Sequence, residues 1–406
     1  VCNSVNDLAY LDSTVSVDRT AQGSAVRSAG METTPVFRHF ACADCGESFD
    51  PDDIEERCPS CTGVLVAQYD HDAREDPAEP PLPFTDDSAV TIDEGATPAT
   101  DCPALADELG VDRLLVKDEG RNPTGAVTDR GLAVAVTAAM QSGATDVALP
   151  TTGNGGQSAA AYAGRAGLDS NSYVPSRCPF VNKAMINVHG GDMNVVEGRY
   201  PDALEVYDDD HDDAWFPAGP VSPYRREGVK ALGYELLTDD ETVPDAVVVP
   251  AGHGIVLAAI HTAVEELAAA GALDGTPTLY AAQPEGCAPI VDACGTADDV
   301  VPEEQPDTIV GPLEVPEPAL GEHAVAAVDE TGGRGVAVED SDALQAAVDA
   351  ANVAGLELSG TGGVALAGAR ELAETFDADA TVALVNPVAG SKEDDLLRSH
   401  LMSQGI

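Results

Sequence analysis

The sequence repeats one pattern, in which a short apolar stretch is followed by a glycine-rich loop and then by a helical stretch. Asp146–Pro150 is the apolar stretch of one unit, residues 151–156 form its loop, and a helix is expected over 158–166. Ala246–Pro250 opens a second unit, whose loop begins at Ala251. Strands that alternate with helices predict α/β domains with parallel sheets, in which loops at the strand ends carry the functional groups.

The amino-acid composition is strongly acidic. The chain has 71 acidic and 20 basic side chains, for a net charge of −51, and 44% of its residues are hydrophobic. That hydrophobic content is enough for a large core. A carboxylate-rich surface stays hydrated at high salt, and this composition resembles that of cytoplasmic proteins from salt-loving archaea. The same charge repels nucleic acids and anionic membranes, so we expect neither as a partner.

The ends and linkers of the chain differ from this α/β pattern. Residues 1–35 are polar, and we expect a disordered extension or an artefact of the assigned start, since Met31 lies just before the first recognisable module. Residues 67–90 are rich in Asp and Pro and are expected to form an acidic linker to an α/β region over 91–406. No stretch resembles a transmembrane helix or a secretory signal, which favours a cytoplasmic location.

Two C-x-x-C pairs stand near the N-terminus. Cys42 and Cys45 form the first pair, and Cys58 and Cys61 form the second after twelve intervening residues. Four thiolates complete the tetrahedral coordination of Zn²⁺ and leave no open position. The spacing therefore predicts a structural zinc ribbon over residues 36–66, whose folding depends on the metal. Two disulfides, which a reducing cytosol disfavours, and a rubredoxin-like iron site are the alternatives.

Residues 117–131 read KDEGRNPTGAVTDRG. On their own they could be a charged strand end and a turn, because Asn-Pro and Thr-Gly are common turn dipeptides. They resemble the signature of the threonine synthase family, K-D/E-x-x-N-P-T-G-S-F-K-D-R-G. Members of that family carry pyridoxal phosphate (PLP) and have fold type II, that of the tryptophan-synthase-β group. The resemblance implies two open-sheet α/β domains with the site in the cleft between them, in addition to the ribbon.

Other segments resemble the same family in the same order, from about residue 36 to residue 400. Zinc ribbons of this kind also occur at the N-terminus of some threonine synthases. The matching segments include residues 94–98, 151–154, 222–230, 283–290 and 359–368.

One position departs from the family where its chemistry is carried out. In the family the second lysine of the signature holds PLP as a Schiff base, and this chain has Thr128 there. Ala126 and Val127 also differ from the family, which argues against a sequencing error in a single codon. A threonine hydroxyl cannot form an imine and is a poor base. No replacement is obvious among the chain's four lysines, which are Lys117, Lys183, Lys230 and Lys392.

The resemblance also implies roles for the first glycine-rich loop. In the family, backbone amides at the start of the following helix bind the substrate carboxylate, as helix N-termini bind anions generally. Here the corresponding residues are Thr151, Thr152 and Gly153, and Asn154 corresponds to the asparagine that contacts the ring oxygen of the cofactor. A plain glycine-rich turn is the alternative for this loop taken alone.

The second loop and the C-terminal segment show further departures. Residues 251–256 stand where the family has the P-x-G-N-G-G-N cradle for the PLP phosphate. Gly252 and Gly254 remain, whereas His253 and Ile255 replace asparagine and glycine. A β-branched residue is unfavourable in a nest of amides, and His253 either assists the anion or is a simple turn residue. Pro387 occupies the position of the threonine that faces the pyridine nitrogen, and it has no hydrogen-bonding side chain.

Two functional hypotheses follow. The resemblance implies a PLP-dependent lyase that converts O-phosphohomoserine to threonine or carries out a related elimination or replacement, with activity lost or altered because Thr128 replaces the lysine. The alternative is a non-catalytic paralogue that binds a small ligand or acts as a scaffold. PLP is the cofactor expected from the family, although its binding stays open, and structural zinc is expected in the ribbon. A small amino acid is the expected partner, and a homodimer stays open as the assembly.

Overall fold

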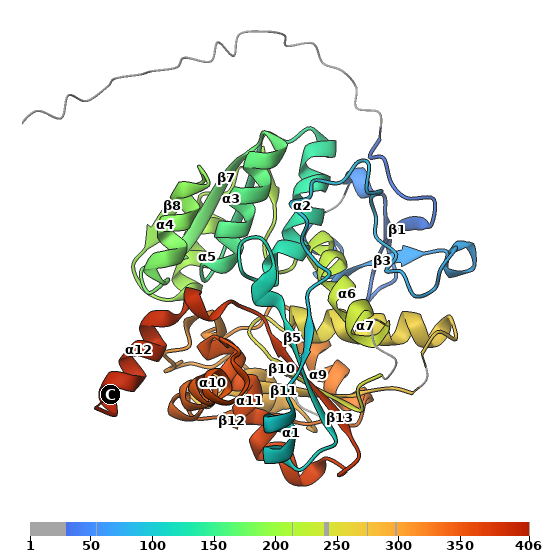
Figure 1. Cartoon of the computed structure of the whole chain (residues 1–406). Coiled ribbons are helices and arrows are strands. Elements are labelled where there is room, and N and C mark those ends of the chain that lie inside the picture. Colours follow the sequence, from blue (N-terminus) through green and yellow to red (C-terminus); the bar gives the residue numbers. More distant parts are fainter. Residues whose placement is uncertain are drawn as a thin grey trace, which may run out of the picture.

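The computed structural model describes residues 30–405 except 54, 213, 239–242, 274 and 297–298. The predicted N-terminal extension therefore lies mostly outside the described residues. In the described part, a small N-terminal sheet precedes two larger open sheets, whose strands and helices form two neighbouring lobes (Figure 1).

The N-terminal sheet is antiparallel, with the strand order β2-β1-β3. Its strands are β1 (Phe37–Cys42), β2 (Ser48–Phe49) and β3 (Leu65–Tyr69). Phe37, Phe40 and Tyr69 pack against Tyr224 of the main body, so this sheet shares a hydrophobic core with the lobe that carries it. Residues 70–98 contain the short 3-10 helix η2 (His71–Ala73) and no strand.

The larger lobe contains a six-stranded sheet with the order β12-β11-β10-β13-β5-β4. Only β4 is antiparallel to its neighbour. The strands are β4 (Ala99–Asp101), β5 (Arg113–Asp118), β10 (Ala246–Pro250), β11 (Thr278–Pro284), β12 (Gly335–Val338) and β13 (Thr381–Asn386). The helices are α1 (Pro103–Leu109), α6 (Pro223–Thr238), α7 (Ile255–Ala269), α8 (Pro289–Ala293), α9 (Gly321–Glu330), α10 (Asp340–Ala354), α11 (Gly360–Leu372) and α12 (Asp394–Ser403).

Both faces of this sheet are buried. Val248 of β10 packs with residues of α1, α10 and α11, whereas its neighbours Val247 and Val249 pack with residues of α6, α7 and α9. Burial on both faces explains why β10 is a continuous apolar run instead of an alternation of polar and apolar residues.

The smaller lobe contains a parallel four-stranded sheet with the order β8-β7-β6-β9. Its strands are β6 (Asp146–Pro150), β7 (Asp169–Pro175), β8 (Asp192–Val196) and β9 (Trp215–Pro217). Its helices are α2 (Thr128–Ser142), α3 (Asn154–Ala166), α4 (Phe180–Val188) and α5 (Tyr200–Asp209). Val147 packs with α2 and α3, and Ala148 packs with α5 on the opposite face.

The predicted α/β class, with two open sheets and a small cysteine-bearing sheet, is confirmed. The domain boundaries within it stay predictions. One element begins earlier than expected, because α3 starts at Asn154 instead of near residue 158. Gly155 and Gly156 resemble a loop in the sequence, yet they form the first helical turn. A Cβ at Gly156 would lie only 2.9 Å from Ile186 and Ser172, so close packing requires glycine there.

Candidate functional site

A cavity of about 130 Å³ lies between the two lobes, where strands of both sheets end and helices begin. Pro150 is the last residue of β6, Pro250 is the last residue of β10, and Pro387 directly follows β13. The first turns of α2, α3 and α7 complete the wall. Crevices at the carboxyl ends of parallel strands are the usual ligand sites of open α/β sheets. The cavity is therefore the candidate site.

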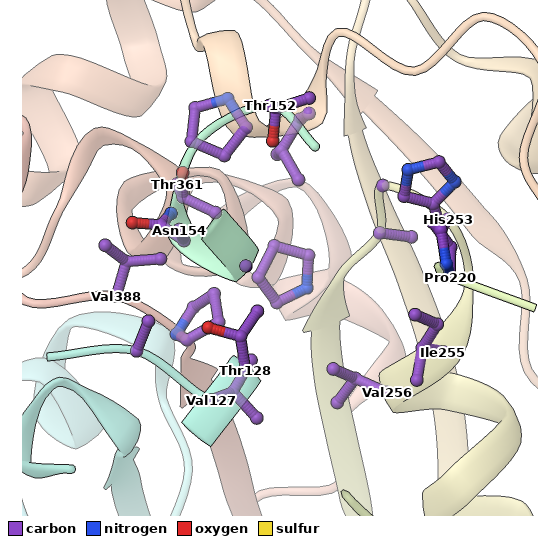
Figure 2. A pocket seen from close by; sticks show the side chains of 18 of the residues that line it. Val127, Thr128, Thr152, Asn154, Pro220, His253, Ile255, Val256, Thr361 and Val388 are labelled. Carbon is purple, nitrogen blue, oxygen red and sulfur yellow. The ribbon is translucent and has the colours of Figure 1, made fainter. Parts of the chain in front are cut away.

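The structure brings together nearly all residues that the sequence predicted for the cleft. Figure 2 shows Thr128 and Asn154 on one side of the cavity, with His253 and Ile255 on the other. Gly153 is the exception, since it does not line the cavity. The predicted residues in the lining are Thr128, Thr151, Thr152, Asn154, Gly252, His253, Gly254, Ile255 and Pro387.

Thr128 is the first residue of α2, and backbone pairing fixes its place. Ala126 forms an antiparallel bridge with Val388, and Val127 N donates a hydrogen bond to Pro387 O at 2.8 Å. The Thr128 hydroxyl lies 2.7 Å from Ser158 Oγ of α3. The position that carries the lysine in the family signature is thus held at the cavity wall, and it presents an oxygen instead of an amine.

None of the four lysines lines the cavity, and each amine is engaged elsewhere. Lys117 Nζ donates to Thr97 O and Glu235, and Lys230 Nζ donates to Glu227 and Glu266. Lys183 Nζ donates to Ser176 O at 3.0 Å. Lys392 Nζ donates to Thr124 O and Gln157 Oε1, both at 2.9 Å. Burial lowers the pKa of Lys392 to about 8, but the residue does not line the cavity.

The loop before α3 has a backbone that only glycine suits. Gly153 has φ +139°, and a Cβ there would lie 2.7 Å from Asn182 Nδ2 and from Cys178 Sγ. Its N–H donates to Thr151 Oγ1 at 3.1 Å. Because the first backbone hydrogen bond of the helix runs from Gln157 N to Gly153 O, the amides of residues 154–156 precede it and are available to an anion. Asn154 Oδ1 is buried and has no hydrogen-bond partner.

The loop before α7 also leads into a helix with free amides, but apolar side chains lie beside them. Gly254 has φ +82°, and a Cβ there would lie 2.7 Å from Leu320 O. Ala258 N donates to Gly254 O, so the amides of residues 255–257 precede the first helical hydrogen bond. Ile255 begins the helix, where no left-handed backbone is required. Its side chain packs on Val64, Ala258 and Leu320 and narrows the space beside these amides.

His253 is held as a neutral ring between the two lobes. Ala319 N donates to its Nδ1 at 3.5 Å, and the Tyr200 ring meets it edge to face at 4.8 Å between centroids. Burial, together with the charge of nearby Arg225, lowers the pKa of His253 to about 3. At neutral pH the ring therefore offers an N–H donor and no positive charge.

Arg225 of α6 is a residue of the cavity to which the sequence analysis gave no role. It is 6% exposed, and Nη1 donates to Ala218 O at 3.3 Å. No ion pair joins it directly to a carboxylate of the described residues, although the more distant charge of Glu56 acts on it, and burial lowers its pKa to about 10. A Cβ at Gly155 would lie 3.6 Å from Arg225 Nη2, which places the guanidinium beside the start of α3. A buried cation without a directly bonded counter-charge is costly, so this wall favours an anionic ligand.

These residues fit PLP only in its non-covalent part. The amides at the start of α7 and the side-chain amide of Asn154 could contact a phosphate and a ring. The covalent part does not fit, because Thr128 has no amine and Pro387 has no hydrogen-bonding side chain opposite a pyridine nitrogen. The cavity lining therefore supports the binding of an anion and does not support imine chemistry.

The four predicted zinc ligands lie together. Cys42 Sγ is 3.4 Å from Cys61 Sγ, Cys45 Sγ is 3.7 Å from Cys58 Sγ, and all four sulfurs lie within 4.8 Å of one another. Zn–S bonds of about 2.3 Å in a tetrahedron separate the sulfurs by roughly 3.8 Å. The cluster can therefore bind zinc, and with four protein ligands its role would be structural. Of the remaining cysteines, Cys2 lies outside the described residues.

The segment between the two cysteine pairs reaches the walls of the cavity. Gly219 N donates to Glu56 Oε1 at 3.2 Å, and Arg57 Nη2 donates to Ala319 O at 3.0 Å. Gly219 precedes Pro220 of the cavity wall, and Ala319 bonds to His253. The N-terminal region, whose sheet is shown in blue beside α6 and α7 in Figure 1, thus contacts segments that form or adjoin the cavity wall.

The model of the family described as pyridoxal-phosphate dependent enzyme matches residues 90–387. Threonine synthase from Methanosarcina acetivorans is 32% identical over 353 residues, which cover 83% of this chain and 87% of that protein. Threonine synthase from Methanocaldococcus jannaschii is 30% identical over 376 residues, which cover 87% of this chain and 93% of that protein. No helix in the described part of the chain is long and apolar enough to cross a membrane.

Solved structures agree on the fold. The L-serine ammonia-lyase from Rhizomucor miehei superimposes with a TM-score of 0.66 at 18% identity, over 77% of this chain and 99% of that one. The threonine deaminase isoform 2 from Solanum lycopersicum gives a TM-score of 0.62 at 20% identity, over 76% and 83%. Together with the match over residues 90–387, these likenesses show that the chain belongs to the family of pyridoxal-phosphate dependent enzymes and is a homologue of threonine synthases.

Proposed function

We propose that this chain binds a small anionic amino acid in its cleft without a covalent cofactor, and that the threonine synthase reaction is lost or altered. The observation that carries the proposal is the position of the amines. Thr128 stands at the cavity wall, and all four lysines are bonded elsewhere. Without an amine within reach, no imine to PLP can form in the cavity.

The class of ligand is inferred from the charges of the wall. Arg225 contributes a buried guanidinium, and the starts of α3 and α7 each contribute amides that precede the first helical hydrogen bond. Both features attract carboxylates or phosphates. The family implies a small amino-acid substrate, and an amino acid with an anionic group satisfies both lines of reasoning.

A second candidate is a threonine synthase-like lyase that uses PLP held only by hydrogen bonds. The side-chain amide of Asn154 and the amides of residues 255–257 favour it, because they correspond to the expected contacts of the ring and the phosphate. The apolar side chains of Ile255 and Val256 beside these amides weigh against tight binding of the phosphate.

Turnover measurements separate the two candidates. The protein is assayed at high salt for phosphate release and threonine formation from O-phosphohomoserine, with and without added PLP. We expect O-phosphohomoserine to bind in calorimetry, with no product above the level of a protein-free control. Threonine formed in proportion to protein and dependent on PLP would support the lyase and overturn the first proposal. Absence of binding would also overturn it.

A further inference from the structure

A chain of hydroxyl groups runs inward from the cavity at the position of the missing lysine. Thr128 Oγ1 lies 2.7 Å from Ser158 Oγ, which lies 3.1 Å from Thr124 Oγ1. Thr124 Oγ1 donates to Asp129 Oδ1 at 2.6 Å, and Thr124 N donates to Asp129 Oδ2 at 2.6 Å. Ser158, Thr124 and Asp129 are buried, so the chain ends on a carboxylate inside the protein.

The hydrogen count sets the direction of this chain. The Thr124 hydroxyl gives its one hydrogen to Asp129, so toward Ser158 it can only accept. The Ser158 hydrogen has Thr124 Oγ1 at 3.1 Å and Asn154 O at 3.2 Å as acceptors inside the protein. The arrangement with the most hydrogen bonds therefore has Thr128 donating to Ser158. Dipoles aligned in this way reinforce one another.

As a result, Thr128 turns lone pairs toward the cavity. Its hydrogen is committed inward, and its oxygen lines the cavity as an acceptor. Asn154 lines the same side of the cavity (Figure 2), but its Oδ1 is buried and is not exposed to the cavity. The Thr128 oxygen is thus the acceptor at this wall that a ligand amine could use.

A positive charge lies about one helical turn from the Thr128 acceptor. Arg225 Nη2 lies beside Gly155, and Ser158 is three residues further along α3, a rise of about 5 Å. The cavity thus has an anion-binding end at Arg225 and the start of α3 and an acceptor at Thr128. A molecule with both an ammonium and an anionic group matches this separation of charge.

We propose that the cavity holds a free amino acid as a zwitterion, with its ammonium group on Thr128 Oγ1 and its anionic group at Arg225 and the start of α3. The inference rests on the proposed function and deepens it, since it assigns the lysine position a new role in recognition. Where the family lysine carries an amine, this chain would accept one from the ligand.

The test compares two ligands by calorimetry in high salt. O-Phosphohomoserine carries the ammonium group, and 4-phosphonooxybutanoate has the same carboxylate and phosphate without it. Wild type should bind the amine-bearing ligand roughly tenfold or more tightly, as expected for hydrogen bonds to a charged group. Thr128→Val keeps the shape and removes the oxygen, so it should abolish this preference while affinity for 4-phosphonooxybutanoate stays unchanged.

Controls distinguish this inference from a general loss of structure. Thr128→Ser keeps the hydroxyl and should retain the preference. Thr145→Val removes an exposed hydroxyl outside the hydroxyl series of Thr128, Ser158 and Thr124, and it should behave as wild type. Equal affinity of wild type for both ligands, or an equal loss of both in Thr128→Val with native melting behaviour, would overturn the inference and leave non-covalent anion binding intact. Failure of wild type to bind either ligand would overturn both proposals.

Discussion

The cysteine cluster and the cleft preserve the family pattern to different extents. In the cluster, all four ligand residues are present and their sulfurs already lie at distances that suit a tetrahedral ion. In the cleft, the loops and helix starts are in place, whereas the residue that carries the chemistry is replaced by Thr128. The fold and its structural support therefore do not require a lysine at position 128.

The same division occurs within residues 117–131. The buried side of this segment keeps a network in which Arg130 bonds to Glu119 and Glu235, and Lys117 bonds to Glu235. The side that faces the cavity is the part that differs from the family signature. Packing and charge pairing therefore account for the buried residues that match the signature, and they do not involve the side chain at position 128, which contacts Ser158 instead.

Disruption of the cluster should have the largest effect. Structural zinc sites contribute apparent binding free energies of about 10–16 kcal/mol, so Cys58→Ser should lose the metal and unfold the N-terminal sheet. Because Arg57 and Glu56 contact the cavity walls, ligand affinity should fall as well. Metal analysis, thermal melting and calorimetry measure the three effects. Cys294→Ser, which lies outside the cluster, should retain about one zinc per chain; wild type without zinc would refute the site.

Removal of the cavity cation should lower affinity and raise stability together. Arg225→Met should weaken binding of O-phosphohomoserine by about 2–3 kcal/mol, or roughly 100-fold. The ligand-free protein should melt at a higher temperature, because a buried charge without a directly bonded carboxylate is removed. The exposed Arg165→Met serves as the control and should change neither quantity. A variant that binds as tightly as wild type would show that the cavity is not built for anions.

The smallest expected effect concerns the retained network. Burial alone would raise the pKa of Glu235, but its hydrogen bonds to Arg130 and the charges of Arg130 and Lys117 hold it at about 2. A lowered carboxylate pKa contributes stability above the unfolded pKa, and this contribution is lost as the pH falls toward 2. With an allowance for partial exposure, Glu235→Gln should cost about 2 kcal/mol at pH 6. Urea titrations between pH 6 and pH 3 should show this difference shrinking; a constant difference would contradict the assigned pKa.

Much of this organisation could be predicted from the sequence. The apolar runs identify β6 and β10 within the correct residues, and the cysteine spacing identifies the cluster. The start of α3 was missed, because glycines that are required by close packing resemble loop residues in a sequence.

The role of Arg225 and the hydroxyl chain could not be found in this way. Arg225 is one of two successive arginines, and only the direction of its side chain distinguishes a cavity cation from its neighbour. Thr128 and Ser158 are 30 residues apart, and their contact depends on how α2 and α3 pack. Contacts between distant elements follow from the assembled fold and not from local pattern.

The central claim is that no native side chain of this protein forms an imine with PLP. Wild type and Thr128→Lys are incubated with one equivalent of PLP at high salt, reduced with borohydride, digested and analysed by mass spectrometry. We expect no pyridoxyl group on any of the four native lysines, and a pyridoxyl group on the introduced residue of the variant. A stoichiometric pyridoxyl group on Lys392, or on any other native lysine, would contradict the account.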